Sequence, residues 1–196
     1  MEYNIGIIIL AAGSSSRLGQ PKQLLDFNGN KFIQNCVQEV FAFSGNSSIV
    51  VTGANRKAVV ECLNKTKVSI CHNPHWELGM GSSIKTGLKK LLLVNPEIEC
   101  CIVSVCDQPY VTTEVFSQLY NQQQTSGKGI VASAYSGTIG VPVLFTKTYF
   151  DALFLLEDQE GAKKLLSKFN DDVTSISFEN GAIDIDTLAD YNKLIL

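Results

Sequence analysis

The chain has 196 residues, a net charge of −3, a hydrophobic fraction of 45% and a charged fraction of 18%. This length suffices for one domain with a substantial core, and the composition is ordinary for a globular protein. The acidic balance argues against nucleic acid as a partner, because nucleic-acid binding needs a basic surface. No apolar run approaches the ~20 residues that span a bilayer. We therefore expect a single domain over residues 1–196, with no membrane partner.

The N-terminus and the cysteines favour a cytoplasmic protein. The apolar run from Ile5 to Ala12 is short for a secretory signal, and Glu2 precedes it without any Lys or Arg. A chain of this size can build its own core, so its cysteines are not expected to form disulfides. Cys71 and His75 lack further ligands at zinc-finger spacing, so no structural zinc site is expected. The six cysteines are Cys36, Cys62, Cys71, Cys100, Cys101 and Cys106.

Apolar runs and helical periods alternate along the first two thirds of the chain. In one predicted helix, Ile84, Leu88 and Leu91 recur at the spacing of a single buried stripe. The predicted strands are Ile5–Leu10, Ser47–Thr52, Lys67–Cys71, Cys100–Val105 and Gly129–Ala134. The predicted helices are Phe32–Phe43, Arg56–Asn64, Ser82–Leu93 and Thr113–Gln124. Apolar strands separated by helices predict an α/β fold with a mostly parallel sheet flanked by helices.

The last third has a less regular pattern. Gly137, Gly140 and Pro142 indicate a loop, which leads into a short strand at Val143–Phe145. The remaining predicted elements are helices at Lys147–Leu156 and Gly161–Phe169, a strand at Val173–Ser177 and a final helix from Leu188 to Ile195. We find no interdomain linker and no internal repeat.

The segment that follows the first predicted strand is the most informative part of the chain. Its small residues let the backbone approach a ligand closely, and successive N–H groups can form a concave anion site. Arg17 can donate two hydrogen bonds to phosphate oxygens, and Lys22 adds a compact positive charge. The segment lacks the P-loop pattern, and a Gly/Ser-rich turn can simply connect two elements without binding a ligand. We interpret it as a polyphosphate cradle formed by Leu10, Ala11, Ala12, Gly13, Ser14, Ser15, Ser16, Arg17 and Lys22.

Three aspartates are candidate Mg²⁺ ligands, since magnesium in nucleotide sites takes one or two carboxylates and substrate oxygens. Asp107 directly follows the predicted strand Cys100–Val105, at the edge of the sheet where ligands bind. Asp184 and Asp186 alternate around an apolar residue, so both carboxylates point the same way. The alternative interpretations are a turn residue at Asp107 and a helix cap at Asp186 or Thr187.

The run from Gly79 to Ser83 precedes a predicted helix. Close backbone approach at Gly81 and Ser82 can accommodate a base or a ribose, although an ordinary helix cap explains the same residues. His72 and His75 flank Asn73-Pro74 without an obvious acid or nucleophile partner, so we interpret both as structural or surface residues. Trp76 is expected to pack rather than to stack on a ligand.

Together these segments resemble the MobA-like nucleotidyltransferases, and most closely the molybdenum cofactor cytidylyltransferases. The resemblance extends over almost the whole chain. It depends on five motifs in the family's order: the opening loop from Leu10 to Lys22, Gly79–Ile84, Cys106–Pro109, Gly140–Phe145 and Asp184–Thr187.

The resemblance implies a Rossmann-like fold of the nucleotide-diphospho-sugar transferase type and transfer of CMP from CTP to the terminal phosphate of molybdopterin, with release of pyrophosphate. Arg17, Lys22 and Asp107 would be the catalytic residues. Mg²⁺ would be held by Asp107 with Asp186 or Asp184, and Gly81 and Ser82 would lie near the base and ribose. A molybdoenzyme would receive the finished cofactor.

The choice of base and acceptor leaves alternatives open. Ala12-Gly13 resembles the cytidylyl branch, whereas the guanylyl branch typically has Gly-Gly there, and the added methyl group favours a pyrimidine. Leu188 replaces a frequent Pro, and the stretch Glu157–Lys163 departs from the family pattern on the acceptor side. The alternatives are GTP as donor, a sugar or polyol phosphate as acceptor, and a non-catalytic molybdopterin chaperone.

Overall fold

A computed structural model describes residues 4–45 and 47–195. Its main feature is a seven-stranded sheet with strand order β5-β4-β1-β6-β8-β7-β9. Strands β5, β4, β1 and β6 run parallel, which confirms the predicted βαβ units of the first half. The strands are β1 (Ile5–Ala11), β4 (Ser48–Thr52), β5 (Ser69–His72), β6 (Cys100–Val105), β7 (Ile130–Tyr135), β8 (Thr138–Thr146) and β9 (Val173–Ser177).

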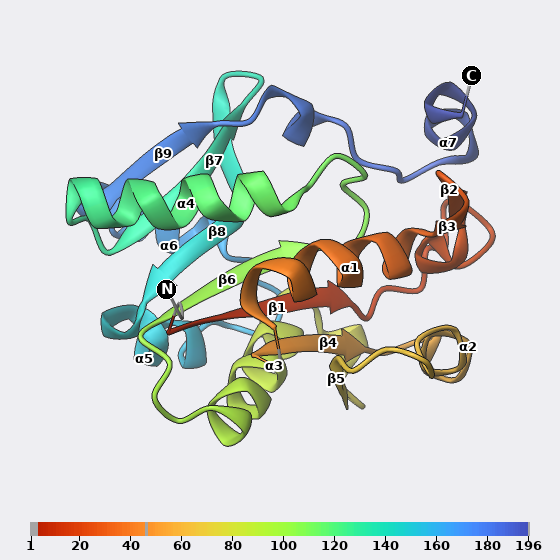
Figure 1. Cartoon of the computed structure of the whole chain (residues 1–196), viewed down its shortest axis with the longest axis horizontal. Coiled ribbons are helices and arrows are strands. Elements are labelled where there is room, and N and C mark those ends of the chain that lie inside the picture. The colour runs from red at the N-terminus through yellow and green to blue at the C-terminus, as the bar shows by residue number, and fades with distance from the viewer. Residues whose placement is uncertain (1–3, 46, 196) are drawn as a thin grey trace.

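Helices cover both faces of this sheet, so its strands are buried on both sides. Along β1, Ile7 and Ile9 join one core cluster, while Ile8 and Leu10 join the other. Helices α1 and α4 cover the face nearer the viewer in Figure 1 and α3 covers the opposite face. The helices are α1 (Phe32–Ser44), α2 (Arg56–Cys62), α3 (Met80–Val94), α4 (Thr113–Ser126), α5 (Phe150–Phe154), α6 (Lys163–Lys168) and α7 (Leu188–Leu194).

The prediction of a loop around Gly137, Gly140 and Pro142 is wrong. These residues lie in or next to β8, which runs antiparallel to both β6 and β7. Ser136 and Gly137 both have positive φ, +48° and +70°, as the tight turn of a β-hairpin requires. A bulge between Ala132 and Ser133 accommodates the extra residues of β8. Helix α4 leads from β6 to β7, and a hairpin then connects β7 to β8.

The structure differs from the sequence prediction at two further places. The helix predicted at Lys147–Leu156 is a 3₁₀ turn at Lys147–Tyr149 followed by the short α5. The sequence analysis also missed a small hairpin of β2 (Asp26–Phe27) and β3 (Asn30–Lys31). Its turn residues, Asn28 and Gly29, have positive φ. An Asn-Gly pair is a recognised signal for such a turn.

All six cysteines are free thiols. Burial raises the pKa of several of them, for example that of Cys36 to about 12, with the charge of Asp107 as a second cause. Among residues 4–45 and 47–195, no helix combines the length and apolarity needed to cross a membrane.

Close packing of α3 on the sheet depends on Gly87. A Cβ at this position would lie 2.4 Å from Ile8 Cγ2 and 2.8 Å from Val51 Cγ2. Both neighbours are fully buried and β-branched, so their side chains have little freedom to move away. The absence of a side chain at position 87 therefore sets how near α3 lies to β1 and β4.

We predict that Gly87→Ala destabilises the protein by up to ~2 kcal/mol. Overpacking a core costs ~1–3 kcal/mol, and the gain in helix propensity from Gly to Ala offsets about 1 kcal/mol of it. Urea unfolding measures the difference. The control is Lys89→Ala on the exposed face of α3, which should change stability by less than ~0.5 kcal/mol. Equal stability of the wild type and Gly87→Ala would contradict the packing argument.

Candidate active site

The loop after β1 folds around Ser15, which adopts a left-handed conformation with φ of +57°. Its carbonyl accepts hydrogen bonds from the N–H groups of Leu18 and Gly19. Its hydroxyl accepts a hydrogen bond of 3.0 Å from the backbone N–H of Lys22. These bonds bring Lys22, which starts a 3₁₀ turn at Lys22–Leu24, back towards the end of β1.

The carbonyl groups of the loop are held by donors outside it. Gln23 Nε2 donates to Ala11 O and Gly13 O, and the N–H of Ala54 donates to Ala12 O. In a trans peptide the C=O and the following N–H point in opposite directions. The N–H groups that follow these carbonyls therefore point away from those donors. In the described part of the chain no hydrogen bond uses the N–H of Gly13 or Ser14, so both can bind an anion.

Four charged side chains from three distant segments meet beside this loop. Lys22 Nζ lies 2.5 Å from Asp107 Oδ2 and 3.0 Å from Asp186 Oδ1. Arg17 Nη1 lies 3.1 Å from the other oxygen of Asp186. The Lys22 and Asp107 side chains are 16% and 20% exposed, whereas Arg17 is 75% exposed. Lys22 is therefore the sheltered centre of the cluster, and Arg17 lies at its open edge.

Burial and charge act in opposite directions on Lys22. Burial by itself would lower the pKa of its ammonium group, but the charges of Asp107 and Asp186, with hydrogen bonds to both, raise that pKa above its usual value. Lys22 therefore stays positively charged. Asp184 forms no ion pair within the described residues. Burial, followed by repulsion from Asp186 and Asp107, raises the pKa of its carboxyl group.

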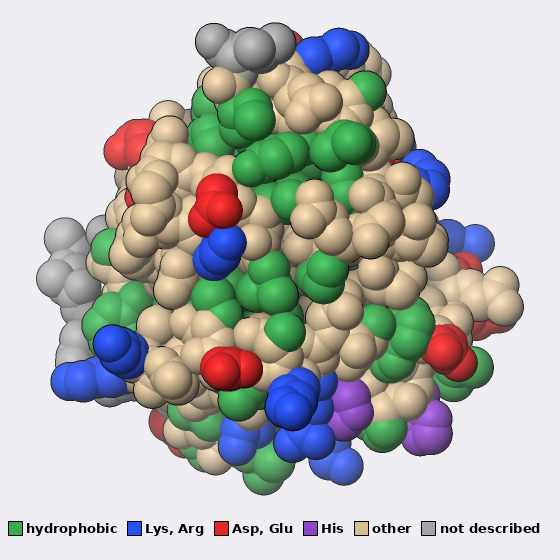
Figure 2. All heavy atoms as spheres, turned by 90° about the vertical axis from the view of Figure 1, so that its right-hand side faces the viewer, with side chains coloured by type: hydrophobic (Ala, Val, Ile, Leu, Met, Phe, Trp, Pro, Cys, Tyr) green, Lys and Arg blue, Asp and Glu red, His purple; other side chains and the backbone are tan. Residues whose placement is uncertain are grey.

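The charged cluster adjoins a cavity of about 330 Å³ at the carboxyl ends of β1 and β6. Acidic, basic and hydrophobic side chains lie side by side on this face of the molecule (Figure 2). Asp107 and Lys22 contribute to the polar side of the cavity, and Trp76 and Met80 to the apolar side. The cavity is lined by Leu10, Ala11, Ala12, Gly13, Ser14, Lys22, Gln23, Trp76, Glu77, Gly79, Met80, Ser83, Val105, Cys106 and Asp107.

The start of α3 differs in detail from the sequence prediction. Ser82 does not line the cavity, because its hydroxyl donates to His75 O or Gly79 O and accepts from Asn73 Nδ2. Ser83 lines the cavity instead, and its hydroxyl accepts a hydrogen bond of 3.0 Å from the same amide. Asn73 is 1% exposed and was not singled out from the sequence. Trp76, which was expected only to pack, is also part of the cavity wall.

Gly81 lies where α3 meets the segment that precedes α6. Its N–H donates a 2.9 Å hydrogen bond to Asp158 O, and a Cβ would lie 2.2 Å from Glu157 O and 2.9 Å from Glu160 O. Lys85 adds an ion pair of 2.7 Å with Asp158. The segment 157–160 is therefore held against the first turn of α3, and only glycine fits at position 81.

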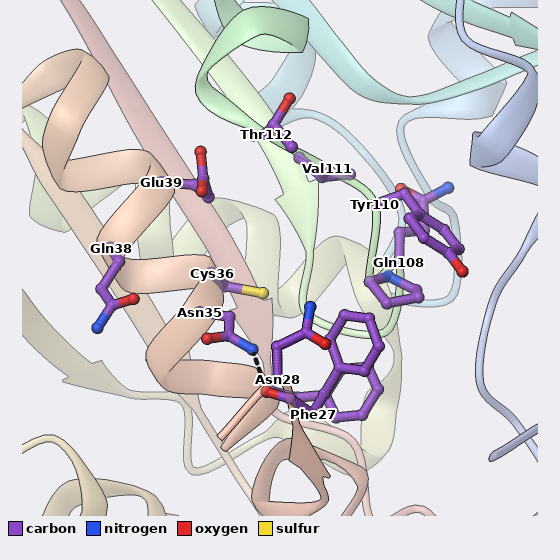
Figure 3. A pocket seen from close by; sticks show the side chains of 12 residues that line it. Phe27, Asn28, Asn35, Cys36, Gln38, Glu39, Gln108, Tyr110, Val111 and Thr112 are labelled. Atoms are coloured by element: carbon purple, nitrogen blue, oxygen red, sulfur yellow. Dashed lines mark hydrogen bonds between the residues drawn. The ribbon is translucent and has the colours of Figure 1, made fainter. Parts of the chain in front are cut away.

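A second, smaller pocket of about 240 Å³ lies on the other side of the turn that follows Asp107. Figure 3 shows α1 on one side of it and the turn from Gln108 to Thr112 on the other. Phe27 reaches it from the β2–β3 hairpin, and its ring meets Tyr110 edge-on at 6.3 Å between centroids. The turn that carries Asp107 is thus bordered by cavities on two sides.

Asp107 and Asp186 fit a hard divalent cation. One oxygen of each carboxylate already lies within 3.0 Å of a single positive atom, Lys22 Nζ, so both converge on one point. Carboxylate oxygens are the ligands that magnesium prefers. Within residues 4–45 and 47–195 no group of three His, Cys, Asp or Glu side chains is suitable for a metal, so substrate oxygens or water would complete the coordination.

A loop with free backbone N–H groups beside a charged cluster at the strand ends of an α/β sheet is an arrangement suited to the phosphates of a nucleotide. Comparison with known proteins agrees, since the model of the MobA-like NTP transferase domain matches residues 7–173. The chain belongs to this family. Its fold is the Rossmann-like fold of the nucleotide-diphospho-sugar transferases, and its enzyme class is nucleotidyltransferase.

Individual relatives cover most of the chain at modest identity. The molybdenum cofactor cytidylyltransferase of Escherichia coli is 26% identical over 190 residues, 95% of this chain and 93% of that protein. A probable molybdenum cofactor guanylyltransferase from Bacillus cereus is 30% identical over 126 residues, 63% of this chain and 59% of that protein. The crystal structure of a Mycobacterium homologue of Rv0371c has a TM-score of 0.84 at 26% identity and covers 100% of this chain and 96% of its own.

We predict that Gly81→Ala separates the segment 157–160 from α3 and destabilises the protein by ~1–3 kcal/mol, because its Cβ meets backbone atoms that cannot rotate away. Thermal unfolding measures the change. The matched control is Gly161→Ala, whose Cβ would meet only the flexible Met80 side chain at 3.1 Å and should be tolerated. Similar melting temperatures for both variants would show that the contact does not constrain position 81.

Proposed function

We propose that the protein transfers CMP from CTP to the terminal phosphate of molybdopterin and releases pyrophosphate. The observation that carries the proposal is the convergence of Arg17, Lys22, Asp107 and Asp186 beside the cavity lined by the loop 10–14. The likeness to the Escherichia coli cytidylyltransferase over 95% of the chain supports the choice of substrates. Mg²⁺ is the proposed cofactor.

The loop after β1 and the two basic residues, Arg17 and Lys22, would bind the phosphates. The N–H groups of Gly13 and Ser14 offer donors at the floor of the site, and Arg17 is exposed enough to fold over an incoming triphosphate. Lys22 contacts both carboxylates. Lys22 and Arg17 are the two cations that can pair with phosphate oxygens and stabilise the negative charge that accumulates on the departing pyrophosphate.

The metal would be held by Asp107 and Asp186, with Asp184 close enough to assist through its charge. When bound, it would neutralise charge on the triphosphate and help to orient it. The remaining contribution of the chain is positional. Small residues at Ala12 and Gly13 let the nucleotide approach the loop, and the sheltered Lys22 stays charged because both carboxylates favour its protonated form.

The reaction requires no general base. An oxygen of the acceptor phosphate, already ionised at neutral pH, forms a bond to the α-phosphorus of the nucleotide. The bond from that phosphorus to the bridging oxygen breaks in line, and the electron pair leaves with pyrophosphate. Such a step depends on positioning and on charge stabilisation rather than on covalent help. This agrees with the absence of a histidine from the residues that line the cavity.

Ala12 supports a pyrimidine donor. It lines the cavity and is only 7% exposed, so its methyl group reduces the space available to a base. The likeness to a guanylyltransferase over 63% of the chain makes GTP the alternative donor. A sugar or polyol phosphate is the alternative acceptor, because the segment 157–163 differs from the pattern of molybdopterin enzymes.

We predict that Asp107→Asn lowers the rate of pyrophosphate release from CTP, molybdopterin and Mg²⁺ by at least ~100-fold, since it removes a charge that both the metal and Lys22 require. The control is Asp26→Asn, which changes a 73% exposed aspartate that does not line the cavity and should keep full activity. If the wild type releases no pyrophosphate with molybdopterin and CTP, GTP or ATP, the proposed acceptor is wrong.

We predict that Ala12→Gly raises the ratio of kcat/KM for GTP over CTP by about 10-fold, a typical effect of one methyl group in a binding pocket. Parallel assays with CTP and GTP at fixed molybdopterin measure it. The control is Ala54→Gly, which lies in the adjacent loop and is exposed. An unchanged ratio would mean that base choice resides elsewhere in the cavity wall.

A further inference from the structure

Each of the two most sheltered charged residues of the site is followed in the sequence by a buried glutamine. Gln23 follows Lys22 and is 0% exposed, and Gln108 follows Asp107 and is 4% exposed. Glutamine is rarely so deeply buried, and a buried polar side chain needs a structural or functional reason. The repetition at two separate places indicates a common purpose.

Gln23 connects the 3₁₀ turn that contains Lys22 to the phosphate-binding loop. Its Nε2 donates to Ala11 O at 3.1 Å and to Gly13 O at 3.0 Å. Both partners can only accept, so the orientation of the amide is fixed. Through the planar peptide groups these two bonds determine where the N–H groups of Ala12 and Ser14 point. Gln23 therefore fixes the direction of the Ser14 N–H, one of the two free donors of the loop, whereas the Gly13 N–H is oriented by the bond from Ala54 to Ala12 O.

Gln108 connects the turn after β6 to the segment that supplies Asp184 and Asp186. Its Nε2 donates to Gly181 O at 2.8 Å and to Val141 O at 3.3 Å. Gly181 belongs to a 3₁₀ turn at Glu179–Ala182. The same two segments are joined a second time, since the N–H of Ile185 donates to Asp107 O at 3.0 Å.

The segment that Gln108 holds has little freedom of its own. A Cβ at Gly181 would lie 2.5 Å from the Tyr135 ring and 2.7 Å from the Phe178 ring, so this turn packs directly on β7. On its other side, the turn that carries Gln108 borders the pocket of about 240 Å³ next to α1 (Figure 3). With a cavity there, hydrogen bonds more than packing hold Asp107 at a fixed distance from Asp186.

The same two side chains indicate that this arrangement lowers the stability of the folded protein. Gln23 Oε1 and Gln108 Oε1 are both buried without a hydrogen-bond partner. An unpartnered buried acceptor is destabilising, and an apolar side chain of the same length would avoid it. Two such acceptors, both beside charged active-site residues, indicate that the bridges made by the amide nitrogens are retained for the geometry of the site.

We propose that Gln23 and Gln108 are positioning residues with separate tasks. Gln23 orients the phosphate-binding loop and so sets the affinity for the nucleotide. Gln108 sets the separation of Asp107 and Asp186 and so sets the affinity for the divalent metal. This inference rests on the proposed function, because it assumes a nucleotide and a metal at these places. It assigns separate tasks to two residues that the proposed function does not use as metal or phosphate ligands.

The test compares Gln23→Met and Gln108→Met, which keep side-chain length but lose the donors, in two binding assays. Mn²⁺ binding is measured by electron paramagnetic resonance without nucleotide, and CTP binding by calorimetry in the presence of a chelator. Gln108→Met should weaken Mn²⁺ binding by about 10-fold or more, as loss of a supporting hydrogen bond does at metal sites, and leave CTP binding within about 2-fold. Gln23→Met should show the reverse pattern, because misplaced donors weaken phosphate binding.

A matched control and a second pair of variants distinguish a specific loss of binding from a loss of folding. Gln124→Met changes an exposed glutamine on α4 and should affect neither ligand. Should a methionine variant fail to fold, Gln23→Ala and Gln108→Ala replace it. Both glutamines line a pocket, so water can reach the carbonyl groups that the shorter side chain releases.

The outcomes separate this inference from the proposed function. If the wild type binds both ligands and each variant loses mainly its own, the division of labour is supported. If both variants lose both ligands in proportion to their loss of melting temperature, the glutamines are merely structural and the inference is overturned. If the wild type binds neither Mn²⁺ nor CTP, the proposed function fails and the inference falls with it.

Discussion

The site depends on one ammonium group shared by two carboxylates. Lys22 Nζ holds Asp107 from the turn after β6 and Asp186 from the segment before α7, and Lys22 itself comes from the loop after β1. Without this cation, two partly buried like charges would repel each other, and only the exposed Arg17, paired with Asp186, would offset the cost of removing them from water. Three segments separated by 85 and 164 positions in the chain are thus joined at one atom. The arrangement also keeps the carboxylates convergent, as a divalent ion requires.

Much of this arrangement could be predicted from local sequence. The apolar runs at Ile5–Leu10 and Cys100–Val105 identify the strands whose ends supply Lys22 and Asp107, because a strand buried on both faces has a distinct composition. Strand ends of a parallel sheet lie at one edge, so the charged residues after them had to be neighbours. Only the last part of the antiparallel β8, Val143–Phe145, was predicted as a strand, because Gly140 and Pro142 usually interrupt strands, and here a bulge and a tight hairpin accommodate them. Local composition cannot show that a bulge and a hairpin will let Gly140 and Pro142 fit into a strand.

The buried glutamines were missed for a related reason. In a sequence, Gln23 and Gln108 read as ordinary polar residues of loops, and nothing in their neighbours signals burial. Their role appears only when the carbonyls of Ala11, Gly13, Val141 and Gly181 are brought near them by the fold. Asn73 behaves in the same way toward Ser82 and Ser83. Sequence periodicity therefore cannot predict the side-chain amides that bridge backbone groups in this site. These amides nevertheless influence where the charged residues point.

In the proposed reaction, the position of β6 lets one group of charged residues serve two substrates. It is the central strand of the sheet, with the parallel strands β1, β4 and β5 on one side and β8, β7 and β9 on the other, where β8 runs antiparallel to both of its neighbours. The proposed nucleotide site lies on the parallel side, where the loop after β1 and the start of α3 line the cavity. Asp107 follows β6 at the point where the sheet changes direction, and Asp186 comes from the segment that follows β9. The two carboxylates that would hold the metal therefore come from both halves of the sheet, and a change on either side that moves one of them would alter the proposed metal site.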